Sequence, residues 1–292
     1  MNLKKYIENL KQYEPIYVIG HSKIDIDSAI ASKILSEILN YFGIKAYYAI
    51  LNENYFFDEY NKRMLDDCIK FEPKIIKKQK VEKYNYFLVD HNDYLQSVGP
   101  KARIVGCIDH HPNSNKVENA IITDCCATSL YLYSVFKEIY TFNEEQKYQI
   151  FMAFLNDATF GKSSRYKKSD EKIAKELGFT ANYDDLFKKY FIPTNLEYGV
   201  KYALYNGHKK YEFENVKFES GYIEAFGTNG IKEYEKLIED KENFLGIWID
   251  YNVPITYVFF NCNGILRKWK YDFVASRATT ILNDTLDIIN RK

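Results

Sequence analysis

The stretch VIGHSKIDIDSAIASKIL, residues 18–35, decides the fold of this chain. It starts with the end of an apolar strand, and from Ser28 onward it has the apolar spacing of a helix. His21, Asp25 and Asp27 stand between these two elements. Open α/β sheets bind their ligands beyond the carboxyl ends of the strands. We therefore expect a ligand site here, and the residue types favour a metal ion.

Strand-like and helix-like segments alternate through the first half of the chain. The predicted strands are short, apolar and partly β-branched, as is typical of strands buried on both faces. They cover residues 16–20, 46–51, 86–90, 103–109 and 120–123. The predicted helices cover residues 28–41, 129–139 and 144–155. This alternation predicts an α/β domain built on a doubly wound parallel sheet.

The pattern changes after about residue 180. The segment 180–199 is polar and aromatic and contains Pro193, so we place the domain junction inside it. Strands are predicted at 218–226, 244–250 and 255–262, and helices at 231–239 and 276–289. We assign residues 1–185 to the first domain and residues 195–292 to a smaller, mixed α+β domain.

The composition narrows the class of protein. Lys+Arg and Asp+Glu both number 40, so no overall charge favours a nucleic acid or a membrane surface as partner. No apolar run reaches the roughly 20 residues that span a bilayer, and the charged N-terminus does not resemble a signal peptide. The five cysteines form no C-x-x-C pair, which argues against a zinc knuckle or a disulfide framework. We expect a cytoplasmic protein; its oligomeric state, a homodimer included, stays open.

Three further polar clusters follow predicted elements of the first domain. LVDHND contains Asp90 and His91, CIDHHP contains Asp109 followed by two histidines, and FLNDATFG contains Asp157. Because parallel strands end at the same edge of a sheet, these clusters can converge. The candidate metal ligands are His21, Asp25, Asp27, Asp90, His110 and Asp157.

These six side chains are too many for one metal ion. Two ions that share a bridging carboxylate fit better, and such pairs serve phosphoryl chemistry. Mixed oxygen and nitrogen ligands suit Mn²⁺, Co²⁺ or Mg²⁺. Each cluster also has a simpler explanation, because Asp27 and Asp157 could cap helices and His110–His111 could form a turn before Pro112. Four such coincidences on successive elements favour the metal site.

Four segments carry a resemblance to a known family. GHSKIDIDS, VDHNDYLQS, IDHHP and NDATFGKSS resemble the N-domain motifs of the DHH phosphoesterase superfamily. They are most similar to the branch that holds the manganese-dependent family II inorganic pyrophosphatases and the exopolyphosphatases. TDCCATSLYLYSVFKE resembles the segment that follows DHH in that branch. The resemblance covers about residues 16–180 and is much weaker in the second domain, which it implies to be a substrate-closing lid.

The resemblance implies a role for each candidate ligand. His21 and Asp25 would hold one Mn²⁺ or Co²⁺ ion, and Asp90 would bridge to a second ion. Mg²⁺ would accompany the substrate. The second ion would be held by Asp27, His110 and Asp157.

The resemblance also implies roles for three residues next to these ligands. His111 would face the substrate phosphate as a catalytic donor. His91 and Asp109 would orient the ligands.

The second domain departs from the family at its substrate motif. Family members carry an S-R-K-K-like motif, whereas this chain has Ser276 and Arg277 followed by Ala278 and Thr279. Arg277 is the expected lid residue, because its planar fork can grip phosphate oxygens with two hydrogen bonds. Lys162 and Lys268 are the other expected substrate contacts; the alternative for Lys268 is a solvated edge strand.

The expected activity is the hydrolysis of inorganic pyrophosphate by a hydroxide formed from water between two cations. The altered lid motif supports an alternative, an exopolyphosphatase or a nucleotide or oligonucleotide phosphodiesterase. The nuclease branch carries a glycine-rich G-G-G-H-like motif, which this sequence lacks, so nucleic acid is not the expected substrate. A third hypothesis is a non-catalytic relative that binds metal or nucleotide.

Overall fold

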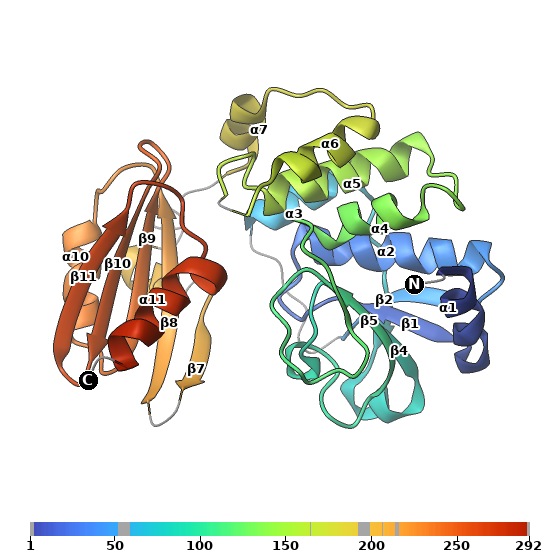
Figure 1. The fold of residues 1–292 in the computed structure, drawn as a ribbon, viewed down its shortest axis with the longest axis horizontal. Coiled ribbons are helices and arrows are strands. Elements are labelled where there is room, and N and C mark those ends of the chain that lie inside the picture. Colours follow the sequence, from blue (N-terminus) through green and yellow to red (C-terminus); the bar gives the residue numbers. More distant parts are fainter. Residues whose placement is uncertain are drawn as a thin grey trace. The chain divides into compact units, whose positions relative to one another are not determined.

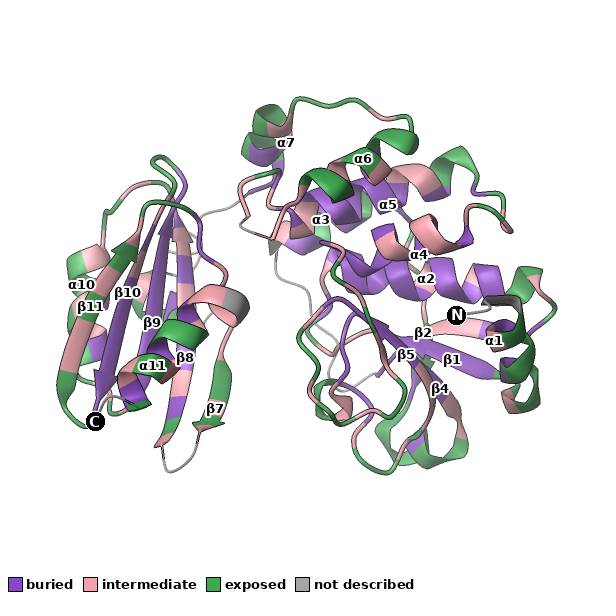
Figure 2. Ribbon diagram, viewed as in Figure 1, coloured by how far each residue is buried: buried purple, intermediate pink, exposed green. Residues whose placement is uncertain are grey.

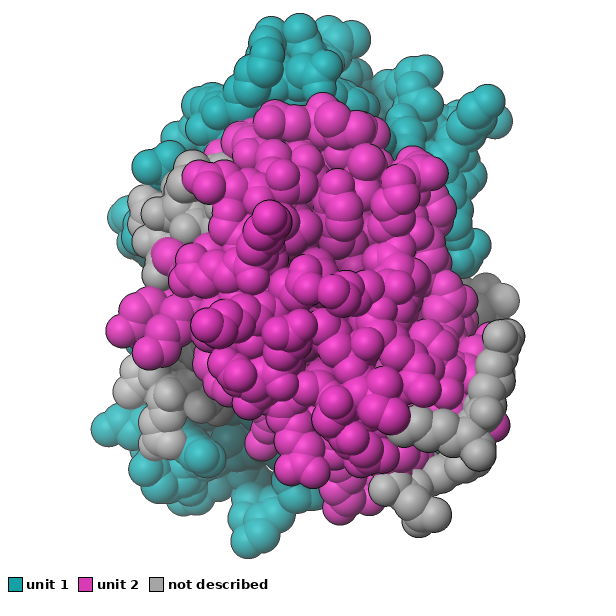
Figure 3. Space-filling model, turned by 90° about the vertical axis from the view of Figure 1, so that its left-hand side faces the viewer, with its two compact units in different colours: residues 1–161, 166–190 teal, residues 162–165, 191–292 magenta. Residues whose placement is uncertain are grey.

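The computed structural model describes residues 3–51, 59–163, 165–191, 199–205, 207–213 and 216–290. The chain divides into two compact units, residues 1–161 with 166–190 and residues 162–165 with 191–292 (Figure 3). Pro193, in the predicted junction, lies outside the described residues, and so does the side chain of Thr279.

The first unit is built on a six-stranded parallel sheet in the order β3-β2-β1-β4-β5-β6. This order places a topological switch point between β1 and β4, as in doubly wound folds. The predicted α/β class is therefore confirmed. The strands are β1 (Ile16–Ile19), β2 (Ala46–Leu51), β3 (Lys74–Ile76), β4 (Asn85–Val89), β5 (Arg103–Asp109) and β6 (Ile121–Ile122).

Helices cover one face of this sheet, where α2, α4 and α5 lie together (Figure 1). The helices of the unit are α1 (Leu3–Leu10), α2 (Ile26–Tyr41), α3 (Glu59–Cys68), α4 (Thr128–Phe136), α5 (Glu144–Asp157), α6 (Lys168–Glu176) and α7 (Tyr183–Tyr190).

The opposite face of the sheet carries a core that includes Tyr17, Tyr86 and Leu88. In the described part of the chain, segments with short 3₁₀ turns at Lys78–Lys83 and Tyr94–Gln96 cover this face, where a standard doubly wound fold would have helices. Connection 77–84 is shorter than the dozen or so residues that a helical crossover needs.

The second unit is a five-stranded mixed sheet in the order β11-β10-β9-β8-β7, in which only β8 and β9 run parallel. Helix α10 (Ile231–Glu239) covers one face and α11 (Leu282–Asn290) the other (Figure 1). The central strands β9 and β10 are almost wholly buried (Figure 2). The mixed α+β class predicted for this domain is thus confirmed. Its strands are β7 (Lys209–Phe213), β8 (Val216–Ala225), β9 (Phe244–Asp250), β10 (Ile255–Cys262) and β11 (Ile265–Tyr271).

Two helical details complete the second unit. A short helix, α9 (Val200–Ala203), packs beside α10. The predicted helix 276–289 begins with a π-helical turn, Arg277–Ile281, before α11. Among all described helices of the chain, none combines the length and apolar character needed to cross a membrane.

Helix α10 is tied to the sheet by the hydroxyl of Tyr234, a fully buried side chain. This hydroxyl donates to the Gly221 carbonyl at 3.2 Å and accepts from the Ile247 amide at 3.0 Å. It therefore joins the two parallel strands of the sheet, β8 and β9, from the helix side.

Tyr234→Phe should lower the free energy of unfolding of the second unit by about 1–3 kcal/mol, because two buried backbone groups lose a partner. Both tryptophans of the chain, Trp248 and Trp269, lie in this unit, so urea unfolding followed by tryptophan fluorescence reports on it. Tyr257→Phe, at a half-buried position of β10, is the control and should cost less than about 0.5 kcal/mol. Equal losses in the two variants would contradict this role of Tyr234.

Candidate metal centre

The six predicted metal ligands gather beyond the carboxyl ends of β1, β4 and β5. His21 follows β1 after Gly20, Asp90 directly follows β4, and His110 directly follows β5. Asp25 and Asp27 stand at the start of α2, and Asp157 is the last residue of α5. The structure therefore brings together residues from five different elements.

Their donor atoms form two groups that share Asp90. In each group, every residue offers one donor atom, and these atoms all lie within 4.8 Å of one another. The first group contains His21, Asp25 and Asp90. The second contains Asp27, Asp90, His110 and Asp157. This division matches the one that the sequence resemblance implies; the roles of these residues as ligands stay predictions.

Asp90 is the buried centre of the arrangement. Its Oδ2 atom lies 3.2 Å from His21 Nε2, and its Oδ1 atom lies 3.0 Å from His110 Nε2. Its backbone has a φ of 60°, a left-handed conformation that costs a non-glycine residue about 1–3 kcal/mol. Such strain is concentrated at functional sites. The chain leaves β4 at this residue.

Backbone amides at helix starts hold two of the carboxylates. Asp25 caps its own helix by accepting the Ser28 amide at 2.8 Å. Asp27 accepts the amides of Thr128 and Ser129, at 2.7 and 3.0 Å, in the first turn of α4. Asp27 is thus a helix cap, as one interpretation of the sequence had it, but of a different helix. Because each carboxylate oxygen has more than one lone pair, capping leaves room for a metal ion.

Gly20 allows this packing. A Cβ atom at residue 20 would lie 1.8 Å from Ser28 Oγ, so only glycine lets the start of α2 approach the end of β1 this closely.

The charges of the site fit a divalent cation. Burial and the neighbouring Asp90 raise the pKa of Asp27 to about 7, and burial and Asp25 raise the pKa of Asp90. Burial acts to lower the pKa of His21, but Asp25 and Asp90 outweigh it and raise this pKa well above its usual value. Carboxylates crowded in this way are stabilised by positive charge. Their oxygens and the imidazole nitrogens are the donor types of hard and borderline metal ions.

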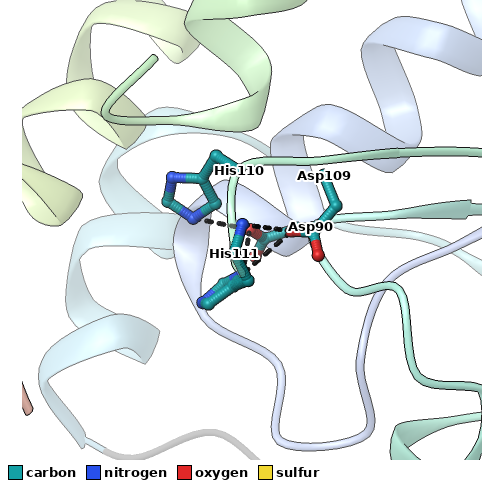
Figure 4. Close-up of side chains that lie close together, drawn as sticks. All are labelled: Asp90, Asp109, His110 and His111. Atoms are coloured by element: carbon teal, nitrogen blue, oxygen red, sulfur yellow. Dashed lines mark hydrogen bonds and ion pairs between the residues drawn. The ribbon is translucent and has the colours of Figure 1, made fainter. Parts of the chain in front are cut away.

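His111 lies at the edge of the site and is held by Asp109 (Figure 4). Asp109 Oδ1 lies 2.9 Å from His111 Nδ1 and accepts the His111 backbone amide at 3.0 Å. Because Asp109 engages Nδ1, the ring presents Nε2 to other partners. The His111 side chain is 33% exposed, whereas that of His110 is 1% exposed, so His111 is the more accessible of the two to a substrate.

Asn92 supports this corner and was missed by the sequence analysis. Its side chain donates to Asp109 and to the Pro112 carbonyl, and accepts the Ser114 amide. Its position in VDHND, two residues after Asp90, is the sequence feature that could have pointed to Asn92.

His91 does not offer a nitrogen to either group. Its Nδ1 atom lies 2.8 Å from the Val89 carbonyl, and its Nε2 atom lies 2.6 Å from Ser97 Oγ. Burial lowers the pKa of His91 to about 4, so the ring is neutral near pH 7. The structure therefore places His91 in the framework beside the site, bonded to Val89 and Ser97.

The structure does not bring the predicted substrate contacts of the second unit together. Lys268 pairs with Glu235 of α10, on the α10 side of the sheet. The Arg277 guanidinium lies over the ring of Tyr222, whose neighbour Ile223 belongs to the core under α10. By strand alternation, Tyr222 and Arg277 are therefore on the opposite side from Lys268.

Lys162 is the remaining predicted substrate contact. Lys162 is half-buried and follows the end of α5. His208 and Lys210 both pair with Glu219, at 3.1 Å each.

A family comparison agrees with this geometry. Residues 15–158 match the sequence model of the DHH family, N-terminal domain. All six predicted metal ligands lie within the segment that matches this DHH domain. No curated protein matches the chain.

Solved structures extend the likeness in fold to the whole chain. A protein from Methanococcus jannaschii assigned to the family II inorganic pyrophosphatases superposes with a TM-score of 0.71 and 17% identity, over 92% of this chain and 97% of that one. An exopolyphosphatase-related protein from Bacteroides fragilis superposes with a TM-score of 0.51 and 15% identity, over 97% and 96%. At these identities the likeness concerns the fold.

Asp90→Asn should reduce the bound metal at both positions, because Asp90 is the residue that the two donor groups share. The wild-type protein should bind about two divalent ions per chain, and the variant fewer than about one. Metal content after Mn²⁺ loading, measured by mass spectrometry, checks this. Asp93→Asn, which removes an ion pair with Lys116 and keeps an oxygen that can accept the Leu95 amide, is the matched control. Wild-type metal content in Asp90→Asn would overturn the shared role.

Proposed function

We propose that this protein is a metal-dependent phosphoanhydride hydrolase whose substrate is inorganic pyrophosphate. The observation that carries the proposal is the pair of donor groups sharing Asp90, since two metal ions with a shared ligand are a recurrent device of phosphoryl transfer. The match of residues 15–158 to the DHH family model and the likeness in fold to the Methanococcus jannaschii protein support it. The proposed cofactors are two Mn²⁺ or Co²⁺ ions, with Mg²⁺ on the substrate.

Divalent cations held by the two groups would neutralise phosphate oxygens and lower the pKa of water. The chain's own residues would orient the reaction. Asp27 accepts the amides of α4, and Asp90 lies between His21 and His110; these contacts restrict the geometry of the site. His111, held through Nδ1 by Asp109, would direct Nε2 to a phosphate oxygen; the doubly protonated ring would transfer its Nε2 proton to the leaving group and become neutral.

Arg277 and Lys162 are the proposed contacts to the substrate phosphates in this mechanism. Lys268 is a weaker candidate, because Glu235 already neutralises its charge. A bidentate guanidinium gives both charge and orientation to a phosphate.

A longer or nucleotidyl substrate is the second candidate. Ala278 and Thr279 stand where the family has lysines, and the likeness in fold includes an exopolyphosphatase-related protein. A lid with fewer free cations suits a substrate with less charge at the reacting end. The complete donor set argues against the third hypothesis, a non-catalytic relative.

Phosphate release by the purified protein with added Mn²⁺ should be fastest on pyrophosphate. The comparison set is tripolyphosphate, long-chain polyphosphate and a short oligonucleotide with both ends analysed. Removal of metal with a chelator should abolish activity, and Mn²⁺ should restore it. A preference for polyphosphate or the oligonucleotide would replace the first candidate by the second, and inactivity on all four with metal bound would favour the non-catalytic hypothesis.

His111→Gln should lower turnover by about 10²–10⁴-fold, the usual contribution of a general acid or base, while the metal content stays normal. The matched control is His208→Gln. His208 is the single histidine of the chain outside the DHH domain, and its ring pairs with Glu219. Loss of bound metal in His111→Gln would make residue 111 a ligand instead.

A further inference from the structure

Arg277 differs from three lysines of the second unit in its pairing. Lys210, Lys268 and Lys270 each pair with a carboxylate, of Glu219, Glu235 and Asp272. Among the described residues, no carboxylate pairs with the half-buried guanidinium of Arg277. The charge of Arg277 is therefore still available to an anion.

Two contacts hold this guanidinium in place. Its Nη1 atom donates to the Gly207 carbonyl at 2.5 Å. Its central carbon lies 5.2 Å from the centre of the Tyr222 ring, within the range of cation–π attraction. Arg277 itself opens the π-helical turn that precedes α11, and such turns are frequent at functional sites.

Gly207 bonds to Arg277 through its carbonyl, and its lack of a side chain leaves space for the Tyr222 ring. Its φ of 55° is left-handed, and a Cβ atom at this position would lie 2.0 Å from Tyr222 Cε1. Any other residue at 207 would displace the Tyr222 ring and, with it, the surface on which the guanidinium rests. The Tyr222 ring and the Gly207 carbonyl thus meet the same guanidinium from two directions.

We propose that Tyr222 is the positioning residue of Arg277, and that it acts together with the backbone of Gly207. This inference rests on the proposed function, in which Arg277 binds a substrate phosphate. Stacking on the ring and the bond to Gly207 restrict the guanidinium to one plane, so that less freedom is lost when it binds a phosphate. One fixed arginine can thereby offset part of the affinity lost where Ala278 and Thr279 replace lysines.

Three variants test the proposal. Tyr222→Leu removes the ring, Tyr222→Phe keeps it and is the matched control, and Gly207→Ala introduces the clash with it. Tyr222→Leu and Gly207→Ala should raise KM for pyrophosphate about threefold to tenfold, with a smaller effect on kcat, because the loss concerns substrate binding. Tyr222→Phe should behave like the wild type. Metal content should stay normal in all three, since the donor groups lie in the first unit.

A second readout does not depend on activity. The chain has only six arginines, so the Nε–Hε signal of Arg277 can be identified by NMR from its loss in Arg277→Lys. In the wild type this signal should carry a ring-current shift and should move when pyrophosphate is added. The ring-current shift should disappear in Tyr222→Leu and remain in Tyr222→Phe. Tryptophan fluorescence verifies that the second unit of each variant is folded.

The outcomes separate this inference from the proposed function. An active wild type together with an unchanged KM in folded Tyr222→Leu would overturn the positioning role, as would an Arg277 signal without a ring-current shift. A wild type that hydrolyses none of the four substrates would overturn the proposed function instead. In that case the positioning role of Tyr222 would be judged from the NMR titration alone. An Arg277 signal that does not respond to pyrophosphate would overturn this inference as well.

Discussion

The candidate site of the first unit depends on one constraint, the burial of the Asp90 carboxylate between two imidazoles. Its two oxygens face His21 and His110, and it belongs to both donor groups. Burying a charge is costly unless the protein supplies partners for it. The order of the sheet supplies them, since β4 lies between β1 and β5 and the three strands end at one edge. The left-handed backbone of Asp90 is the local cost of this placement.

Around that centre, the protein fixes acidic side chains with backbone amides. Asp25 and Asp27 accept amides from the first turns of α2 and α4, and Asp109 accepts the amide of His111. A backbone amide in a helix has almost no freedom of its own, so it holds a carboxylate more rigidly than a long side chain could. The interaction of Asp25 and Asp27 with the helix dipoles is also favourable, because helix N-termini stabilise negative charge.

The sequence predicted those parts of the structure that depend on local pattern. The β1–α2 stretch and the central strands of both sheets are long enough apolar segments to be recognised, and His–Asp clusters after successive strands pointed to one edge. Strand β3 has only three residues among lysines, so pattern could not find it. Helices α1 and α3 are short and were not predicted, although Ile7 and Leu10 in α1 and Met64, Leu65 and Cys68 in α3 are buried at helical spacing. The bond from Asp27 to the Thr128 amide, between residues 101 positions apart, required the folded structure, as did the pairing of Lys268 with Glu235.

The spread of the donor groups along the chain has a consequence for folding. The donors run from residue 21 to residue 157 and come from five elements of the first unit. A cation bound there would act as a reversible cross-link that closes long loops of chain, and it would bind only when the sheet is assembled. By mass action, a free ion at a thousand times its dissociation constant adds about 4 kcal/mol to the stability of the folded state. The availability of metal in the cell would then set how long the first unit survives proteolysis.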